Sequence, residues 1–391
     1  MSLTELLATN EAKELADVQR QAPAGWQAGR ELIGDRGTGI TRGMAPEMPA
    51  DHRTMLTDAG FNPEEYVIVG DVHHREWDAQ TKTGIQRLVS RRFNVRAIQS
   101  QSTDIKELLA LVRRRKAKVQ QDVGQSDGGT FVFAQGDYQL GKIDGDGTEG
   151  TVDRIVRSID QAAAEYKALR KTRRLPFVHT PWLGDCIEGF QSQGGKNAWR
   201  TELTLTEQLR LTRRLMLYTI DAFAPLADRV TAVSVPGNHD EAMRIPVATR
   251  FDDSFAVDAL IAVQEAMHLN PAAYGHVETI VPRQDELTVT MDVNGTVITH
   301  LHGHQFRPGK HWDWWKGQSF DLKSEAHQAQ IMLYAHGHHF TIDTKGARTA
   351  IMTPPQESKS QWWVNKTGEL GAPGAQIFTM EKGKARDYSI V

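Results

Sequence analysis

The chain has very little of several features that would narrow its class at once. It contains one cysteine, Cys186, among 391 residues, so an internal disulfide is excluded. Its formal net charge is −3, which gives the chain as a whole no strong attraction for a polyanion. The sequence shows no signal peptide and no apolar run of about 18 residues, the length that a membrane-spanning helix needs. We therefore expect a cytoplasmic protein that does not enter a membrane.

Histidine is the residue type that the chain has in excess. Fifteen are present, and more than half of them fall in the last quarter of the sequence. These are His300, His302, His304, His311, His327, His336, His338 and His339. Histidines that merely decorate a surface would be spread along the chain, so this clustering favours a metal site, for which imidazole is a common ligand.

Length and patterning indicate two parts. With 39% hydrophobic residues, a chain of this length can bury a large core and carry an added module. We expect residues 1–125 to form an N-terminal accessory arm and small module, and residues 126–391 to form a catalytic domain with C-terminal hairpins. The patterns in the first part are a helical segment, a stretch rich in Gly and Pro, a hairpin and a basic helix, at residues 3–21, 23–63, 66–95 and 104–119.

From residue 130 onward, apolar strands alternate with amphipathic helices. Strands are expected at residues 131–134, 175–183 and 230–235, and helices at residues 152–169 and from Thr204, which opens a capping box with Glu207. Such alternation predicts an α/β fold in which helices cover a sheet. Farther on, Asn294-Gly295 marks a hairpin, and a strand at 331–335 ends directly at His336.

Chemically reactive side chains follow these strands directly. The most informative stretch is Gly237-Asn238-His239-Asp240, which comes just after the strand at 230–235. The others, in chain order, are Gly136-Asp137, Gly184-Asp185, His300-Leu301-His302-Gly303-His304 and His336-Gly337-His338-His339. Because an open α/β sheet holds its chemistry at the carboxyl ends of its strands, we expect these groups to converge on a metal site.

A two-ion site needs oxygen and nitrogen ligands and a carboxylate that bridges the ions. Asp185 is the candidate bridge, Asp137 would bind one ion, and Asn238 would supply an amide oxygen to the other. The imidazoles expected to complete the two sets of ligands are His302, His336 and His338.

His239 neighbours a ligand and can still point at substrate, so it suits the general acid that protonates a leaving oxygen. Glu188 or Asp240 would then orient its imidazole. His304 and His339 could be outer hydrogen-bond donors or simply exposed.

In this order the motifs resemble those of the calcineurin-like metallophosphoesterase superfamily, over residues 130–355. The closest similarity is to its nuclease branch, the SbcD-type and phage-encoded DNA nucleases, because residues 136–142 (GDYQLGK) look like their Ser-Asp-x-His-Leu-Gly-Lys. The resemblance implies a four-layer αββα sandwich and two divalent ions, manganese first, with magnesium, iron or zinc as alternatives. It also implies hydrolysis by a metal-activated water.

Three departures from the family pattern stand out. Gln139 replaces a metal-binding histidine; we keep it as a ligand, since an amide oxygen binds hard ions such as manganese. Glu188 replaces an aspartate. The last motif reads Ala335-His336-Gly337-His338, and a shifted register, residues 337–340, would lose one ligand. A competing origin for the first motif is Gly70-Asp71-Val72-His73, which we interpret as a polar turn of the accessory hairpin.

The leading hypothesis is a metal-dependent phosphodiesterase, most readily a DNA exonuclease or endonuclease. Basic runs at 113–118 and 170–174, and tryptophans beside lysines at 310–316 and 359–363, fit a DNA substrate, although solvated charge and buried aromatics explain them as well. The alternatives are a phosphomonoesterase or cyclic-nucleotide phosphodiesterase of the same fold, and a degenerate, non-enzymatic scaffold. Besides DNA, a second copy of the chain or a separate ATPase stays open as a partner.

Overall fold

The computed structural model describes the residues 29–33, 36–44, 51–63, 65–81, 84–97, 104–118, 128–191, 195, 200–243, 248–320, 324–361, 364–365, 368 and 370–391. The chain divides into two compact units, Met1–Asp104 and Ile105–Val391, and each is described by itself. The helix expected at 3–21 and the pair Trp362 and Trp363 lie outside the described residues. Within the described ranges, no helix combines the length and the apolar character needed to cross a membrane.

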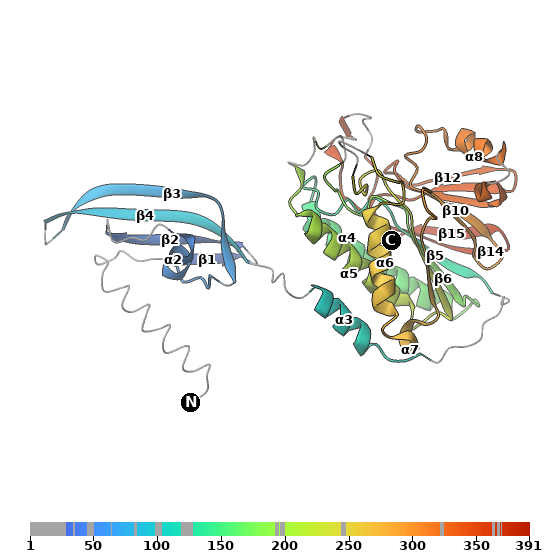
Figure 1. The fold of residues 1–391 in the computed structure, drawn as a ribbon, viewed down its shortest axis with the longest axis horizontal. Coiled ribbons are helices and arrows are strands. Elements are labelled where there is room, and N and C mark those ends of the chain that lie inside the picture. Colours follow the sequence, from blue (N-terminus) through green and yellow to red (C-terminus); the bar gives the residue numbers. More distant parts are fainter. Residues whose placement is uncertain are drawn as a thin grey trace. The chain divides into compact units, whose positions relative to one another are not determined.

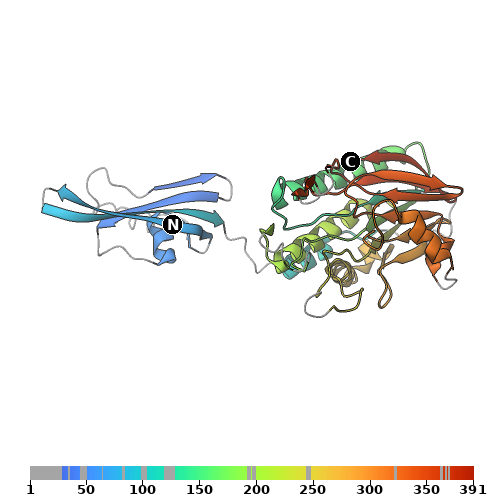
Figure 2. The same ribbon diagram turned by 90° about the horizontal axis from the view of Figure 1, so that it is seen from above.

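The first unit is an antiparallel sheet with one short helix. The strand order is β1-β2-β4-β3, with β1 at Gly29–Ile33, β2 at Arg36–Met44, β3 at Tyr66–Thr81 and β4 at Gly84–Ala97. Asp51 is the N-cap of helix α2 (His52–Asp58), and its carboxylate accepts a hydrogen bond from the backbone N–H of Thr54 at 2.9 Å. Figure 2 shows the long β3–β4 hairpin extending past the two shorter strands, and this pairing confirms the hairpin expected from the sequence.

The expected boundary near residue 125 differs from the observed one, which falls at Asp104. Helix α3 (Asp104–Arg114) carries Val112, which is fully buried in the core of the second unit. The Val112 carbonyl accepts a hydrogen bond from Asn270 Nδ2 at 2.8 Å, and Arg115 pairs with Asp221. The basic face of this helix predicted an accessory element, but its apolar face needs a partner surface and finds it on the second unit.

The second unit contains a six-stranded sheet of order β15-β14-β5-β6-β7-β8. Its strands are β5 (Thr130–Ala134), β6 (Phe177–Trp182), β7 (Arg229–Ser234), β8 (Val277–Ile280), β14 (Gln376–Glu381) and β15 (Lys384–Ile390). The four from β5 to β8 run parallel, and β14 joins β5 in the antiparallel sense. The helices between them are α4 (Gly147–Leu169), α5 (Leu205–Phe223), α6 (Phe255–Met267) and the short α7 (Pro271–Tyr274). Thr204 and Glu207 form the expected capping box of α5.

A second sheet has five strands in the order β12-β13-β11-β10-β9. They are β9 (Val289–Asp292), β10 (Val297–His300), β11 (Ile331–Tyr334), β12 (Thr341–Lys345) and β13 (Arg348–Met352). The hairpin at Asn294-Gly295 joins β9 to β10 as expected, with Asn294 and Gly295 both at positive φ. Helix α8 (His311–Phe320) and the short 3₁₀ helix η4 (Glu325–Gln328) follow on the outer face of this sheet.

Three apolar clusters show that these elements form four layers. One lies between α4, α5, α6 and the six-stranded sheet, and includes Phe133, Ile159 and Phe223. The next lies between the two sheets, and the third places Trp312 and Trp315 of α8 on the far side of the five-stranded sheet. Figure 1 shows the helices on opposite sides of the paired sheets. The predicted αββα sandwich is therefore confirmed.

Candidate metal centre

The site is built by loops that leave the ends of five strands in both sheets. The loops after β5 and β6 run side by side, because the backbone N–H of Asp137 donates to Gly184 O at 3.1 Å and that of Gln139 donates to Asp185 O at 2.9 Å. Parallel pairing of β10 with β11 brings their ends together in the other sheet. Residues far apart in the sequence therefore meet at one edge of the sandwich.

Glycine allows these loops to approach closely. A Cβ atom on Gly237 would lie 2.0 Å from Asp185 Oδ1 and 2.2 Å from the Asp185 backbone nitrogen. A Cβ atom on Gly136 would lie 2.8 Å from the Cβ atom of Ala335. The glycines of the Gly-Asp and Gly-Asn motifs are thus required by packing between loops.

The backbone itself is unusual at the proposed ligands. Five non-glycine residues of the site have positive φ, namely Asp137 (50°), Gln139 (43°), Asp185 (53°), His336 (69°) and His338 (53°). Each such conformation costs about 1–3 kcal/mol and persists only where the surroundings impose it. Concentration of such strain in one place is typical of functional sites.

His302 lies at the centre of the first candidate ion position. Its Nδ1 is 2.7 Å from the carbonyl oxygen of Leu183, which can only accept, so Nδ1 carries the hydrogen. In the neutral ring, Nε2 then presents a lone pair to Asp185 Oδ2 at 3.0 Å and to His336 Nδ1 at 3.1 Å. Donor atoms of Asp185, His302 and His336 lie within 4.8 Å of one another, the one such cluster among the described residues. We call this the Asp185 position.

Asp137 and His338 define a second place, the Asp137 position. The Nδ1 of His338 lies 2.8 Å from Glu357 Oε1, so it carries the hydrogen and Nε2 faces Asp137 Oδ1 at 3.6 Å. The other carboxylate oxygen of Asp137 accepts a hydrogen bond from the His336 backbone N–H at 2.9 Å. The preferred register of the last motif therefore gives His336 to one position and His338 to the other.

Buried oxygens without a hydrogen-bond partner test whether cations fit here. Asp137 Oδ1 and Asn238 Oδ1 are both buried and both lack one. Asp185 Oδ2 is also buried, and its neighbour is His302 Nε2 at 3.0 Å, which donates to it when the ring is charged. An unpartnered buried oxygen costs about 1–3 kcal/mol or more, and a bound cation would remove this cost. The donor set fits a divalent ion.

The charges of the site are strongly coupled. Burial raises the pKa of Asp137, whereas the imidazoles of His302 and His239 outweigh burial at Asp185 and hold the pKa of that carboxyl well below its usual value. Burial alone would lower the pKa of His302, but Asp185 and Asp137 raise it to about 9. Burial, helped by the nearby His302, lowers the pKa of His336 to about 3. His336 is therefore neutral near pH 7 and has a free nitrogen lone pair for an ion.

His239 lies beside this cluster with a carboxylate behind it. Its Nδ1 is 3.2 Å from Glu188 Oε2 and 3.1 Å from the Glu188 carbonyl, and its Nε2 is 4.0 Å from Asp185 Oδ2. Burial would lower the pKa of His239, but the carboxylates of Asp185 and Glu188 raise it to about 10, so the ring is protonated near pH 7. Of the two candidates for orienting this ring, the geometry places Glu188 there.

Asp240 does something different from what the sequence suggested. Its two carboxylate oxygens accept hydrogen bonds from the backbone N–H groups of Ile187 and Gly237, both at 3.1 Å. Burial, followed by the charge of Asp185, raises its pKa to about 7. Asp240 therefore ties the loop after β6 to the loop after β7, with both carboxylate oxygens engaged by backbone N–H groups.

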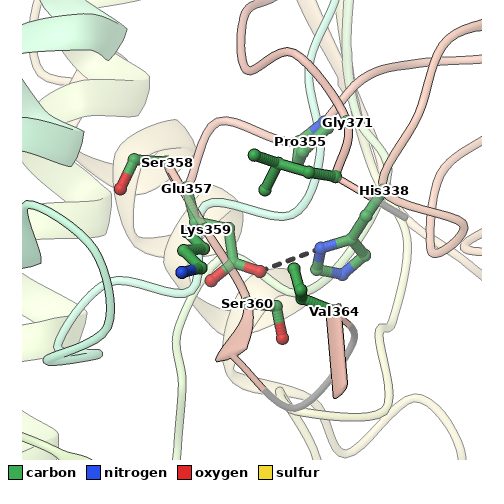
Figure 3. A pocket seen from close by; sticks show the side chains of 9 residues that line it. His338, Pro355, Glu357, Ser358, Lys359, Ser360, Val364 and Gly371 are labelled. Carbon is green, nitrogen blue, oxygen red and sulfur yellow. Dashed lines mark ion pairs between the residues drawn. The ribbon is translucent and has the colours of Figure 1, made fainter. Parts of the chain in front are cut away.

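Two residues that sequence reasoning did not single out complete the site. Lys142 Nζ lies 2.6 Å from Gln139 Oε1 and 2.6 Å from Glu357 Oε2, and both Lys142 and Glu357 are buried. Glu357 thus joins Lys142 to His338, at a small pocket that also includes Ser358 (Figure 3). The lysine was visible as the end of the nuclease-like motif, whereas no motif marks Glu357.

Several other candidates lie on the first unit or at the margin of the site. Asp71 and His73 are exposed on β3 of the first unit. His304 packs its ring 5.4 Å from that of His302, and His339 Nδ1 bonds to Gly337 O at 2.6 Å. Burial raises the pKa of the Cys186 thiol well above its usual value, so this group is not an activated nucleophile.

Two of the tryptophans and some residues of the basic runs make contacts within the fold. Trp312 and Trp315 are buried and stacked on each other, with ring centroids 5.3 Å apart, so neither offers a face for a nucleic acid base. Lys118 Nζ donates to Ala224 O, and Arg173 pairs with Asp387. The interpretation of Trp312 and Trp315 as buried packing residues is therefore confirmed.

Comparison with known proteins gives likenesses of structure only. No family model and no curated protein sequence matches the chain. A predicted phosphoesterase from Streptococcus pneumoniae is 10% identical, with 66% of this chain and 86% of that one covered and a TM-score of 0.31. An archaeal phosphodiesterase is 12% identical, with 67% of this chain and 99% of that one covered and a TM-score of 0.32. Zinc-complexed Vps29 from Entamoeba histolytica is 13% identical, with 66% of this chain and 98% of that one covered and a TM-score of 0.30. At such TM-scores the chemistry has to be argued from the residues of the site.

Proposed function

We propose that the chain is a metal-dependent phosphodiesterase that hydrolyses DNA. The observation that carries the proposal is the meeting of two unpartnered buried oxygens, from Asp137 and Asn238, with the ligand cluster of Asp185, His302 and His336 at one edge of the sandwich. A divalent ion bound there would supply Lewis acidity toward a phosphate oxygen and would make water a better nucleophile near pH 7. Structure alone does not require this arrangement, which leaves strained backbone and unsatisfied oxygens in the core.

His239 has the position and the charge of a proton donor. Hydrolysis adds a water oxygen to phosphorus, and the bond from phosphorus to the leaving oxygen breaks. That oxygen departs as a hydroxyl if His239 gives it the Nε2 proton. Glu188 holds the opposite nitrogen, so the ring keeps its orientation during this transfer. His239 then recovers its proton from solvent.

The first unit supports DNA over a small ester. The missing side chain of Gly39 leaves room for the ring of Phe93, which shows that Phe93 faces the core of this unit. The neighbours Arg92 and Arg96 must therefore point to the opposite face, where both are exposed. Arg75, opposite Ser90 in the register, shares that face. Arginines that form no ion pair within the described part of the chain suit the phosphates of a long polyanion.

The test uses the full chain with manganese and three substrates: end-labelled single-stranded DNA, end-labelled double-stranded DNA and bis(p-nitrophenyl) phosphate. His239→Gln should lower kcat at least about 100-fold, the usual contribution of a general acid. His268→Gln, a change at an exposed histidine that ends α6, is the matched control and should have wild-type activity. The paired change Arg92→Gln and Arg96→Gln should raise KM for DNA relative to the small ester.

The outcomes separate the functions. Cleavage of the small ester without cleavage of DNA would replace the nuclease by a small-ester phosphodiesterase. If neither substrate is hydrolysed with manganese, magnesium, iron or zinc, the result would favour the non-enzymatic scaffold. Equal activity of wild type and His239→Gln would remove His239 from its role while keeping the metal centre.

A further inference from the structure

The two ion positions are unequal. At the Asp185 position, one carboxylate and two imidazoles offer ligand atoms within 4.8 Å of one another, and the imidazole of His239 lies 4.0 Å from Asp185 Oδ2. At the Asp137 position the family's histidine is Gln139, whose side-chain oxygen already accepts a hydrogen bond from Lys142 at 2.6 Å. An amide oxygen shared with an ammonium group is a poorer ligand than a free imidazole.

Lys142 is a buried side chain with a fixed position rather than an exposed surface lysine. The turn that contains it is closed by a hydrogen bond from the Lys142 backbone N–H to Gln139 O at 3.1 Å. Gly141, at φ 98°, lets this turn pack against Gln208, since a Cβ atom there would lie 2.7 Å from the Gln208 side chain. The ammonium is buried and lies 2.6 Å from Glu357 Oε2. Its position is thus set by backbone, packing and charge together.

The same carboxylate also holds a proposed metal ligand. Glu357 Oε1 is 2.8 Å from His338 Nδ1, while Oε2 pairs with Lys142. The backbone N–H of Glu357 donates to the carbonyl oxygen of Asp137 at 3.2 Å, which fixes the segment against the first loop. A chain of contacts therefore runs from Gln139 through Lys142 and Glu357 to His338, and it places one positive charge against Gln139, a proposed ligand of the Asp137 position.

We propose that Lys142 is a built-in cation of this centre, so that the chain binds one divalent ion tightly at the Asp185 position and a second ion much more weakly at the Asp137 position. The Lys142 ammonium compensates part of the negative charge that a second ion would otherwise compensate, and it repels a cation that enters the Asp137 position. Loss of a ligand or of its supporting partner weakens metal binding about 10–100-fold, so we expect at least tenfold between the two sites. This inference rests on the proposed metal centre but not on DNA as the substrate.

Calorimetric titration of metal-free full-length protein with manganese chloride, without substrate, tests the proposal. Wild type should show one tight site per chain and a second site at least tenfold weaker. Gln139→His with Lys142→Met should tighten the second site at least tenfold, whereas Lys142→Arg, which keeps the charge, should leave it weak. Lys310→Met, at an exposed lysine of the same unit, is the control.

If Lys142→Met does not fold because Glu357 loses its partner, the double change Lys142→Met with Glu357→Gln removes both charges, and Gln139→His alone keeps the network. Two equally tight ions in wild type, no tight ion at all, or no tightening in the Gln139→His variants would overturn the proposal. Because binding is measured without catalysis, a protein that binds one ion and cleaves no DNA would refute the function and keep this inference.

Discussion

Replacing Glu357 by glutamine tests the buried charge network with a known sign and size. The side chain keeps its shape, but Lys142 loses its anionic partner and His338 Nδ1 loses a charged hydrogen-bond acceptor. Burial would raise the pKa of Glu357, yet Lys142 and His338 together lower it from 4.5 to about 2. At about 1.4 kcal/mol for each tenfold change in proton affinity, the carboxylate contributes about 3 kcal/mol to stability. Removing one partner of a buried ion pair has a similar effect.

The assay is urea unfolding at several pH values, followed by tryptophan fluorescence. A folded pKa below the unfolded one means that the stabilisation is complete above about pH 4.5 and is lost as the pH falls toward 2. Wild type should therefore exceed Glu357→Gln by about 3 kcal/mol at pH 7, and the gap should shrink at pH 3.5. Glu325→Gln, which breaks an exposed pair with Arg283, should change stability by less than about 1 kcal/mol. A gap that stays constant with pH would refute this account of Glu357.

Three further expectations can be checked in the same way. Trp315→Ala should cost about 3–5 kcal/mol, because this fully buried ring is stacked on Trp312, whereas Phe320→Ala on the same helix removes an exposed ring and should cost less than about 0.5 kcal/mol. Burial lowers the pKa of His300 to about 4, so the unfolded chain binds a proton at this residue at a higher pH than the folded chain does. Wild-type stability should therefore fall by up to about 3 kcal/mol between pH 6.5 and 4. Replacing His300 and its partner His179 together by leucine should flatten this dependence in urea titrations. Thr204→Ala removes the capping box of α5 and should lower the urea midpoint by the equivalent of about 1 kcal/mol.

The layers and the ligand-bearing loops could be predicted because they follow from local patterns. An apolar run followed by Gly-Asp or Gly-Asn identifies a strand end, and parallel strand ends share one edge of a sheet. The capping box at Thr204 and the Asn294-Gly295 turn are equally local. None of these requires knowledge of which distant residues touch.

The remaining features depend on contacts that no local pattern contains. Glu357 lies in a segment without a motif, and it meets Lys142 because its backbone is bonded to Asp137 far back in the chain. Asp240 adjoins His239 in sequence, yet its side chain turns to the backbone of Ile187. The end of the first unit was misplaced since the partner surface of Val112 comes from residues much later in the chain.

The proposed ligands come from both sheets, with Asp185 and Asn238 after strands of one and His302 and His336 after strands of the other. An ion bound there would link the two sheets. Removing it with a chelator should therefore weaken the packing between the sheets and leave the hydrogen bonding within each sheet intact. Hydrogen exchange of the β6 and β10 amides, compared with and without manganese, would detect this weaker packing while all strands are still formed.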